Sequence, residues 1–415
     1  MPPYSATQQP AVRLPPEGVP TPDRRGFWVF AALLTLFPMA ASAPSPLYAD
    51  YAARWQFSDT TLTIVFAVYA APLLIALLVF GSFSDEIGRK PVTLVAAGLL
   101  AASLTLFITA DGLTALIAAR ALQGFATGLL TAVASAALLD LQPSRRPGLA
   151  SLLGAALSTG GLGLGALLSG FLVQYAWSPS KLTYLILLGA LGLLAIATAS
   201  WADETVTHRI RPRIRVLVSV PAEARPIFLA ATPCLISTWA LISFYLSLGP
   251  KLVTTLSHSS SHLPGAISVA LLTGLASLVT LATKNWASHT SMVSGCAVLT
   301  AGSGLTVAAI AINCPVLFYL STMIAGIGFG LAFSGAFRSI VALAEPTERG
   351  ALIAATYVLG YTAFAIPAII SGVISTHEGL CHTAIGYSAA VAGLALIALL
   401  STHHTSRRST PAGSH

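Results

Sequence analysis

Long apolar runs recur along almost the whole chain, and they decide what it can fold into. Between Phe27 and Leu400, stretches of about twenty residues with few charges alternate with short polar links, and each stretch can span a hydrocarbon layer about 30 Å thick. Such a segment must satisfy its own backbone hydrogen bonds, so the runs are predicted to be helices. The strands of a membrane barrel would instead alternate apolar and polar residues. We therefore expect an all-α integral membrane protein with about twelve transmembrane helices.

Charge and cysteine content narrow the function classes. Only 8% of the 415 residues are charged, against about 25% in soluble domains. The net charge of +7 comes from basic residues spread over short links, which argues against a nucleic-acid partner. None of the four cysteines forms a CxxC pair, so no metal site is expected. Cys314 and Cys381 fall in links on one side of the membrane, and we expect them to stay unpaired.

The links divide the chain into two six-helix halves. The predicted spans are 27–48, 60–81, 92–110, 113–139, 149–174, 181–201, 227–250, 264–283, 290–312, 315–342, 351–374 and 382–401. We expect a disordered cytoplasmic tail over 1–25, an N-terminal half over 26–202 and a C-terminal half over 226–401. A basic cytoplasmic linker, 203–225, joins the halves, and a second cytoplasmic tail covers 402–415.

The distribution of Lys and Arg predicts the orientation. With both termini in the cytoplasm, sixteen of the 21 basic residues fall on the inside, as the positive-inside rule requires. Three fall outside and two lie within spans. The sixteen are Arg13, Arg24, Arg25, Arg89, Lys90, Arg145, Arg146, Arg209, Arg211, Arg213, Arg215, Arg225, Lys284, Arg349, Arg407 and Arg408. We expect a multi-pass protein of the cell inner (plasma) membrane.

Glycines repeat at one offset between the halves. Gly124 and Gly128 match Gly326 and Gly330 at a separation of 202 residues, and Gly148 matches Gly350 at the same separation. A single offset held over a long segment indicates duplication. Because six helices per copy is an even number, both copies insert in the same direction, as parallel repeats. Glycines spaced four apart also let helices pack closely, and we expect that role for Gly128, Gly326 and Gly330, with Gly161 and Gly165 in the fifth span.

The link after the second span carries the most specific motif. It reads Gly-Ser-Phe-Ser-Asp-Glu-Ile-Gly-Arg-Lys from Gly81 to Lys90, and it resembles the cytoplasmic loop G-x-x-x-D-x-x-G-R-[KR] of the major facilitator superfamily. The resemblance implies a latch made by Gly81, Asp85, Gly88, Arg89 and Lys90. In that family the acid faces the start of the eleventh helix, where free N–H groups favour a carboxylate. The latch would hold the cytoplasmic side closed.

The fourth span contains an arginine within a second motif that resembles the same family. Arg120, Gln123 and Gly124 are similar to the R-x-x-x-G motif of the same family, which implies a cavity residue that helps couple proton movement to transport. An arginine within a membrane is costly and indicates function by default. The alternative is that Arg120 reaches the nearby outer surface with its long side chain. The glycine-rich fifth span lacks the Gly-Pro step of the family's antiporter motif.

Few other polar groups lie at mid-membrane. All fourteen Asp and Glu fall in links, tails or span ends, which argues against a cation exporter with a buried acid. Aromatic residues on the spans that line the pathway in the family suit an amphipathic organic solute, although ordinary packing would also explain each one. The cavity candidates beside Arg120, Gln123 and Gly124 are Trp239, Tyr245, Tyr357 and Tyr361.

These patterns favour a secondary transporter. We expect it to move a small organic molecule across the membrane by alternating access, as an efflux protein working by proton antiport, with an uptake symporter or uniporter as the alternative. A sensor or channel that does not transport is a third alternative. No nucleophile–base pair or metal-ligand set indicates an enzyme, so we assign no catalytic residues. We expect no cofactor beyond a proton gradient, and as partners a small-molecule substrate and the lipid bilayer, with the protein a monomer.

Overall fold

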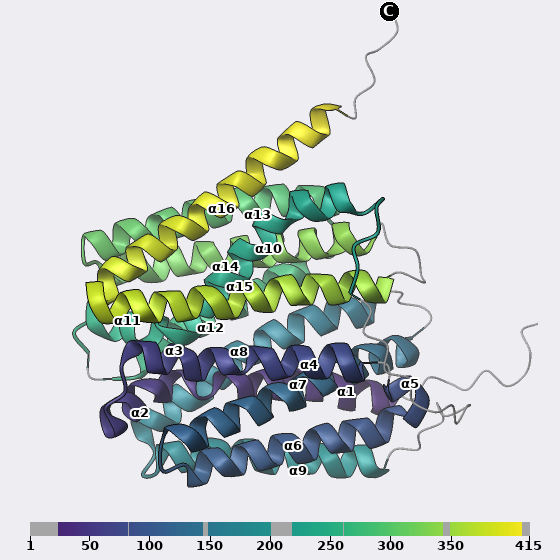
Figure 1. The fold of residues 1–415 in the computed structure, drawn as a ribbon, viewed down its shortest axis with the longest axis vertical. Helices are drawn as coiled ribbons and strands as arrows, with labels where there is room; N and C mark the ends of the chain where they lie inside the picture. The colour runs from purple at the N-terminus through teal and green to yellow at the C-terminus, as the bar shows by residue number, and fades with distance from the viewer. Residues whose placement is uncertain are drawn as a thin grey trace, which may run out of the picture.

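The computed structural model describes residues 24–81, 83–143, 148–200, 218–259, 261–342 and 349–408. Over these residues it is helical, and twelve helical segments are long and apolar enough to cross a membrane. The predicted all-α membrane fold is confirmed. Figure 1 shows two bundles of roughly parallel helices, one from each half of the chain.

The last helix of the first half, α9, ends at Ser200, and the first helix of the second half, α10, begins at Arg225. The first half contains α1 (Arg24–Ser42), η1 (Ser45–Leu47), α2 (Tyr48–Trp55), α3 (Asp59–Val68), α4 (Ala70–Phe80), α5 (Phe83–Ile87), α6 (Arg89–Thr109), α7 (Leu113–Leu141), α8 (Leu149–Tyr175) and α9 (Pro179–Ser200). The second contains α10 (Arg225–Ser247), α11 (Gly249–Leu256), α12 (Leu263–Ala282), α13 (Ser288–Ala311), α14 (Pro315–Val341), α15 (Arg349–Glu378) and α16 (Leu380–Arg408).

The predicted domain boundaries are only partly covered. Residues 1–23, most of the predicted first tail, and 201–217, most of the predicted linker, lie outside the described residues. The predicted second tail begins at 402, yet α16 continues to Arg408. Pro411 is the first residue after 401 that disfavours a helix, because proline lacks the N–H group that donates a hydrogen bond in a helix interior.

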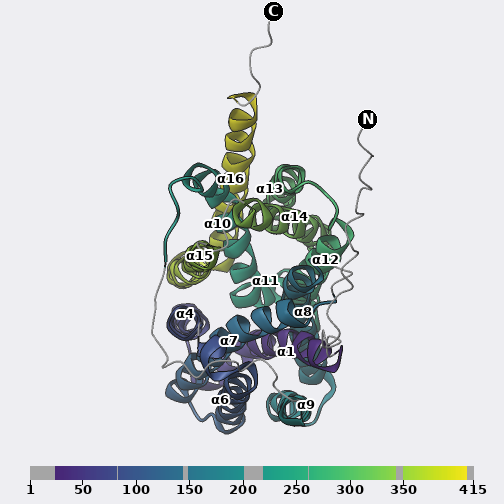
Figure 2. The ribbon, with the colours of Figure 1, turned by 90° about the vertical axis from the view of Figure 1, so that its right-hand side faces the viewer.

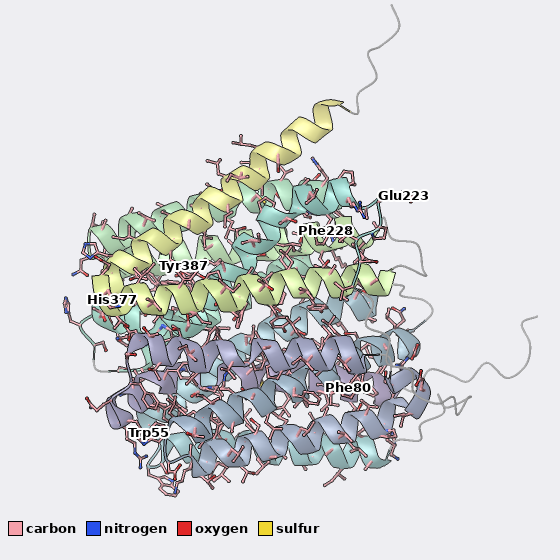
Figure 3. The ribbon with its side chains drawn as sticks, viewed as in Figure 1. Trp55, Phe80, Glu223, Phe228, His377 and Tyr387 are labelled. Carbon is pink, nitrogen blue, oxygen red and sulfur yellow. The ribbon has the colours of Figure 1, made fainter. Side chains whose placement is uncertain are left out.

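The two ends of the bundle differ in what they carry. The first residues of α1 and α10 lie at the same end of the bundle, which we call the basic end. We call the other end of the bundle the opposite end. In Figure 3, Phe80 and Glu223 lie at the basic end, and Trp55 and His377 lie at the opposite end. Figure 2 views the molecule from the basic end, with α11 visible between the two halves.

Helix packing repeats in the two halves. In the first, α7 packs against α1, α4 and α6, and α9 packs against α1 and α6. In the second, α14 packs against α10, α12 and α13, and α16 packs against α10 and α13. These are corresponding helices of the repeat. The halves meet symmetrically as well, since α8 packs on α12 and α15 packs on α3.

Prolines break two of the spans in the first half. Pro72 has no N–H to donate to the carbonyl of Val68, and a proline ring clashes with that carbonyl, so α3 ends at Val68 and α4 begins at Ala70. In the same way Pro44 cannot donate to the carbonyl of Ala40, and α1 ends at Ser42. Both breaks leave backbone carbonyl groups without their usual helical partners.

Candidate functional site

Side chains of α7 occupy the two helix breaks. Gln123 donates from Nε2 to the carbonyl oxygen of Ala40, at 2.9 Å. Arg120 donates from Nη1 to the carbonyl oxygen of Ala41, at 3.0 Å, and from Nη2 to that of Phe66, at 3.1 Å. One arginine therefore ties the end of α1 to the end of α3, and Gln123 uses the carbonyl of Ala40 that Pro44 left available.

Arg120 is held in the interior of the first half. Its side chain is 1% exposed, so it does not reach the outer surface in this structure, and its role in a cavity stays a prediction. Gln123 Oε1 accepts a 2.6 Å hydrogen bond from Nη1. The guanidinium also lies 4.6 Å from the ring centre of Tyr69 and 5.6 Å from that of Phe66, within the range of cation–π attraction.

The charge of Arg120 has no counter-ion in the described part of the chain. Ion pairs among these residues, such as Arg89–Asp140, Lys251–Asp59 and His262–Asp50, do not involve Arg120, and Arg120 Nε makes no hydrogen bond there. A cation in a low-dielectric interior depends on such partners for its stability. Carbonyl dipoles and aromatic faces stabilise this one, so its energy depends on the exact positions of α1, α3 and α4.

An aromatic cluster lies where the halves meet. Phe66 of α3 packs on Phe364 of α15, with ring centres 4.8 Å apart. Trp239 of α10 packs on Tyr361 of α15 at 4.7 Å and on Phe364 at 6.4 Å, and Tyr357 completes the group at 6.4 Å from Trp239. We call these five residues the aromatic cluster. The structure thus brings together three predicted cavity residues, Trp239, Tyr357 and Tyr361, and links them through Phe66 to Arg120.

Tyr245, the fourth aromatic candidate, lies elsewhere. Its hydroxyl forms a 2.8 Å hydrogen bond with Thr322 of α14, and its side chain is 1% exposed inside the second half. Thr322 corresponds to Arg120 in the repeat. A neutral Tyr–Thr pair therefore joins α10 to α14 where the charged Arg120 joins α1 to α7, so the buried charge belongs to the first half alone.

The predicted latch residues lie at the basic end. Gly88 has φ 107°, a conformation that favours glycine, and it starts α6. Arg89 donates to Asp140 of α7 at 3.1 Å and to Ser84 Oγ at 2.5 Å. Lys90 follows in α6, Gly81 ends α4, and the side chain of Asp85 lies outside the described residues. The contact of Asp85 with the start of α15 stays a prediction.

The predicted packing glycines lie at helix crossings, and so does Gly124, which was predicted as a cavity residue. A β-carbon on Gly124 would overlap the carbonyl oxygen of Tyr69, and one on Gly128 would overlap that of Leu73. Their repeat counterparts make the same approach to α12, Gly326 at Leu272 and Gly330 at Ala276. Gly161 and Gly165 approach the carbonyl oxygens of Thr35 and Met39 in α1.

Sequence reasoning missed a set of contacts between the halves at the opposite end. Lys251 Nζ of α11 lies 2.5 Å from Asp59 Oδ1 of α3, and Ser375 Oγ of α15 donates to Asp59 Oδ2 at 2.7 Å. Thr60 and Thr376 share a 3.0 Å hydrogen bond beside them. The sequence offers no signal for this pairing beyond an acid at a span end. These contacts close the opposite end between α3, α11 and α15.

An ion pair between His262 and Asp50 adds a pH-dependent contact at the opposite end. His262 Nε2, before α12, lies 2.9 Å from Asp50 Oδ1 of α2. Hydrogen bonding to Asp50 raises the pKa of His262 above its usual value, against a smaller opposing effect of burial. A raised pKa means that the protonated pair stabilises closure at low pH, and that this contribution is lost as the pH rises through the raised pKa.

We expect closure of the opposite end to weaken as the pH rises above about 6.5, the usual pKa of histidine, and through the raised pKa of His262. Spin labels at Ala53 and Thr255, in a variant without the native cysteines, would report the distance between α2 and α11 in the two halves. The population with the short distance should fall as pH rises. His262→Gln should remove most of that dependence, and an unchanged pH profile in this variant would refute the assignment.

Comparisons with known proteins now identify the family. A model of the Major Facilitator Superfamily matches residues 30–366. The chain belongs to the major facilitator superfamily. The assignment agrees with the loop motif at Gly81–Lys90 and with the paired six-helix halves.

The chain is similar to multidrug resistance proteins of bacteria. The chain is 30% identical over 189 residues to Multidrug resistance protein D of Escherichia coli, a match that covers 45% of this chain and 47% of that protein. It is 29% identical over 316 residues to Multidrug resistance protein MdtL of Salmonella schwarzengrund, covering 74% and 78%. The first match thus spans about half of its relative.

As a major facilitator protein, the chain is a multi-pass membrane transporter rather than an enzyme. The four cysteines are free thiols, Cys314 and Cys381 among them. Membership of the family does not specify the substrate, the direction of transport or the coupling ion.

Proposed function

We propose that this transporter exports an amphipathic organic molecule across the bacterial inner membrane by alternating access, coupled to proton antiport. The observation that carries the proposal is the aromatic cluster, which both halves build together. Rings from α3, α10 and α15 meet there, and sites of this superfamily lie between the halves near the midplane. Relatives named multidrug resistance proteins favour export.

The basic end is assigned to the cytoplasm. At that end Arg89 and Lys90 start α6, Arg225 starts α10 and Lys284 follows α12, which agrees with the positive-inside rule. Both termini are then cytoplasmic. With this orientation, the contacts around Asp59 close the external side, and the structure corresponds to a state that faces the cytoplasm.

The substrate class follows from what surrounds the cluster. Aromatic rings supply apolar faces, and the indole Nε1 of Trp239 is buried without a hydrogen-bond partner among the described residues. An unsatisfied buried donor is costly, and a substrate acceptor would satisfy it. All fourteen acids lie outside mid-span positions, so a fixed positive charge on the substrate would find no carboxylate. We infer an uncharged or acidic aromatic solute.

Arg120 is proposed to link substrate binding to the movement of α1. Phe66 contributes its ring to the aromatic cluster and its carbonyl oxygen to Arg120. A substrate that displaces the ring therefore shifts a hydrogen bond of the buried cation. The latch from Gly81 to Lys90 is proposed to hold the cytoplasmic side when it closes, with Asp85 as its acid. The protein is proposed to act as a monomer.

The direct test of the substrate site is Trp239→Ala. Removing the ring deletes apolar contact on Tyr361 and Phe364 and the free N–H, so the KM for an exported dye should rise about tenfold or more. Transport into inside-out vesicles would be measured with an uncharged aromatic dye and its quaternary ammonium derivative. We expect transport of the uncharged dye only.

Trp286→Ala is the matched control, because Trp286 is exposed at the basic end. Its KM should equal that of the wild type. An unchanged KM in Trp239→Ala, or preferential transport of the quaternary dye, would contradict the proposed site. Accumulation in right-side-out vesicles driven by an inward proton gradient would instead support uptake by symport.

A further inference from the structure

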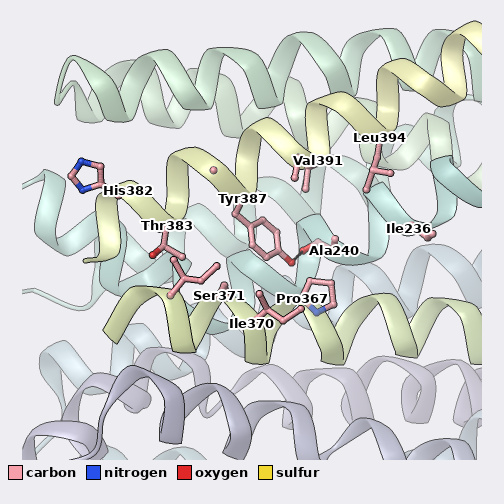
Figure 4. A pocket seen from close by; sticks show the side chains of 13 residues that line it. Ile236, Ala240, Pro367, Ile370, Ser371, His382, Thr383, Tyr387, Val391 and Leu394 are labelled. Carbon is pink, nitrogen blue, oxygen red and sulfur yellow. Dashed lines mark hydrogen bonds between the residues drawn. The ribbon is translucent and has the colours of Figure 1, made fainter. Parts of the chain in front are cut away.

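A groove lies on the second half between α10, α15 and α16. Its volume is about 320 Å³, at the lower end of the range of small-molecule pockets, about 300–1,000 Å³. Ile236 of α10, Pro367 and Ile370 of α15, and Tyr387 and Leu394 of α16 line it, as Figure 4 shows. Ile370 is 52% exposed, so the groove opens outward, toward the bilayer.

The divergence of two helices creates this groove. In Figures 1 and 2, α16 leans away from α15 toward the basic end, while Tyr387 holds it to α10 through a 2.8 Å hydrogen bond to the carbonyl oxygen of Ala240. Gly386 leaves further space, because a β-carbon there would meet no atom within 4 Å. The groove therefore results from how the helices pack and from a missing side chain.

The chemistry of the lining selects an apolar occupant. Tyr387 donates to Ala240, Ser371 to the carbonyl oxygen of Ala368, and Thr383 to that of Gly379. Each of these lining hydroxyls thus donates to the backbone, and the other lining side chains apart from His382 are aliphatic or absent. A polar ligand would lose its own hydrogen bonds on entering, whereas a methylene chain loses none.

The length of the groove matches one leaflet of a bilayer. His382 stands at the end near the start of α16 and Leu394 at the other (Figure 4). Twelve residues of helix separate them, which is about 18 Å, against about 15 Å for half of the hydrocarbon core. An occupant would run from the opposite end of the protein to near the midplane, with a histidine at the interface.

The position of the groove favours a resident molecule over a transported one. Every lining residue belongs to the second half, and alternating access moves one half largely as a rigid body against the other. We therefore expect the groove to keep its shape and its side of the membrane in both states. We propose that it binds a phospholipid of the leaflet at the opposite end, with one acyl chain along α16 and the phosphate beside His382.

Photolabelling would test this lipid site. The full chain would be reconstituted in phosphatidylcholine vesicles that contain a small share of phosphatidylcholine with a diazirine on one acyl chain. After illumination, mass spectrometry of the peptides would compare labelling of 367–394 with that of α9, which faces lipid in the other half. We expect about tenfold enrichment over α9, since buried methylenes bind more favourably than bulk lipid contacts.

Gly386→Phe should fill the groove and lower labelling of 367–394 to the level of α9. Gly192→Phe is the matched control, because a β-carbon on Gly192 of α9 also meets open space and Gly192 lies far from the groove in sequence. In this variant the enrichment of label in 367–394 should persist. Ala390→Phe fills the groove from the next turn if Gly386→Phe folds poorly. Equal labelling of both segments in the wild type, or enrichment that survives both groove variants, would overturn the proposal.

The same vesicles separate a resident lipid from a transported compound. A dye that the protein exports should leave the labelling of 367–394 unchanged at saturating concentration. Displacement of the label by that dye would show that the groove belongs to the transport pathway, and the proposal of a resident lipid would fail. This outcome does not depend on whether export is coupled to protons.

Discussion

Arg120→Lys is expected to lower transport more than tenfold while the protein still inserts and folds. The guanidinium of Arg120 reaches Ala41, Phe66 and Gln123 at once, and a lysine ammonium cannot reproduce this planar fork. A hydrogen bond to a charged group contributes about 1.5–3 kcal/mol. Loss of one or two such bonds in the interior is therefore enough for the expected effect. Initial export rates in vesicles, normalised to the amount of folded protein, would measure it.

Arg338→Lys is the matched control for this substitution. Arg338 of α14 also donates to backbone carbonyl oxygens, those of Lys284 and Trp286 at 3.1 Å, but these lie at the basic end, away from the aromatic cluster. We expect transport by Arg338→Lys to stay within about threefold of wild type, because water can replace partly exposed hydrogen bonds. Full activity of Arg120→Lys would remove Arg120 from the coupling mechanism.

Gly124→Leu is expected to disrupt the first half. The backbone of α7 at Gly124 lies against the backbone of Tyr69 at the junction of α3 and α4, so no side-chain rearrangement can make room. Overpacking costs about 1–3 kcal/mol where side chains can shift, and here we expect about 3 kcal/mol or more. The yield of monodisperse protein by size-exclusion chromatography should drop sharply.

Gly98→Leu makes the same chemical change without the clash. A β-carbon on Gly98 of α6 meets no atom within 4 Å, so this variant should be recovered like the wild type. Gly326→Leu, the repeat counterpart that approaches Leu272 of α12, should behave like Gly124→Leu. Equal recovery of Gly124→Leu and Gly98→Leu would contradict the close packing of α7 on α3 and α4.

The membrane explains why the fold could be predicted from sequence. A hydrocarbon solvent forces each span to be long, apolar and helical, so the helices are visible as apolar runs. The offset between Gly124 and Gly326 then predicted the repeat, and the matching helix contacts of the halves agree with it. Exact helix ends were less predictable, as the continuation of α16 to Arg408 shows.

The placement of single side chains was harder to predict. Hydropathy does not say which face of α10 meets the other half, so Trp239 and Tyr245 were both predicted to line the cavity. Only Trp239 joins the aromatic cluster. Arg120 was expected to line a cavity because of the motif it resembles and the cost of a charge within the membrane. Its bonds to backbone carbonyls could not be predicted, because no side-chain pattern reveals them. Pro44 was a signal only for the partner of Gln123, since it leaves the carbonyl of Ala40 without its usual donor. Asp59 and Lys251 are 192 residues apart, beyond any local pattern.

The measurement that tests the account most directly is substrate-driven proton flux in acidified inside-out vesicles. An uncharged aromatic dye would be added outside, on the side assigned to the cytoplasm, to wild type and to Arg120→Lys. We expect the dye to enter and protons to leave the lumen in wild type, with both fluxes reduced together in the variant. Dye entry without proton release in wild type would contradict proton-coupled export.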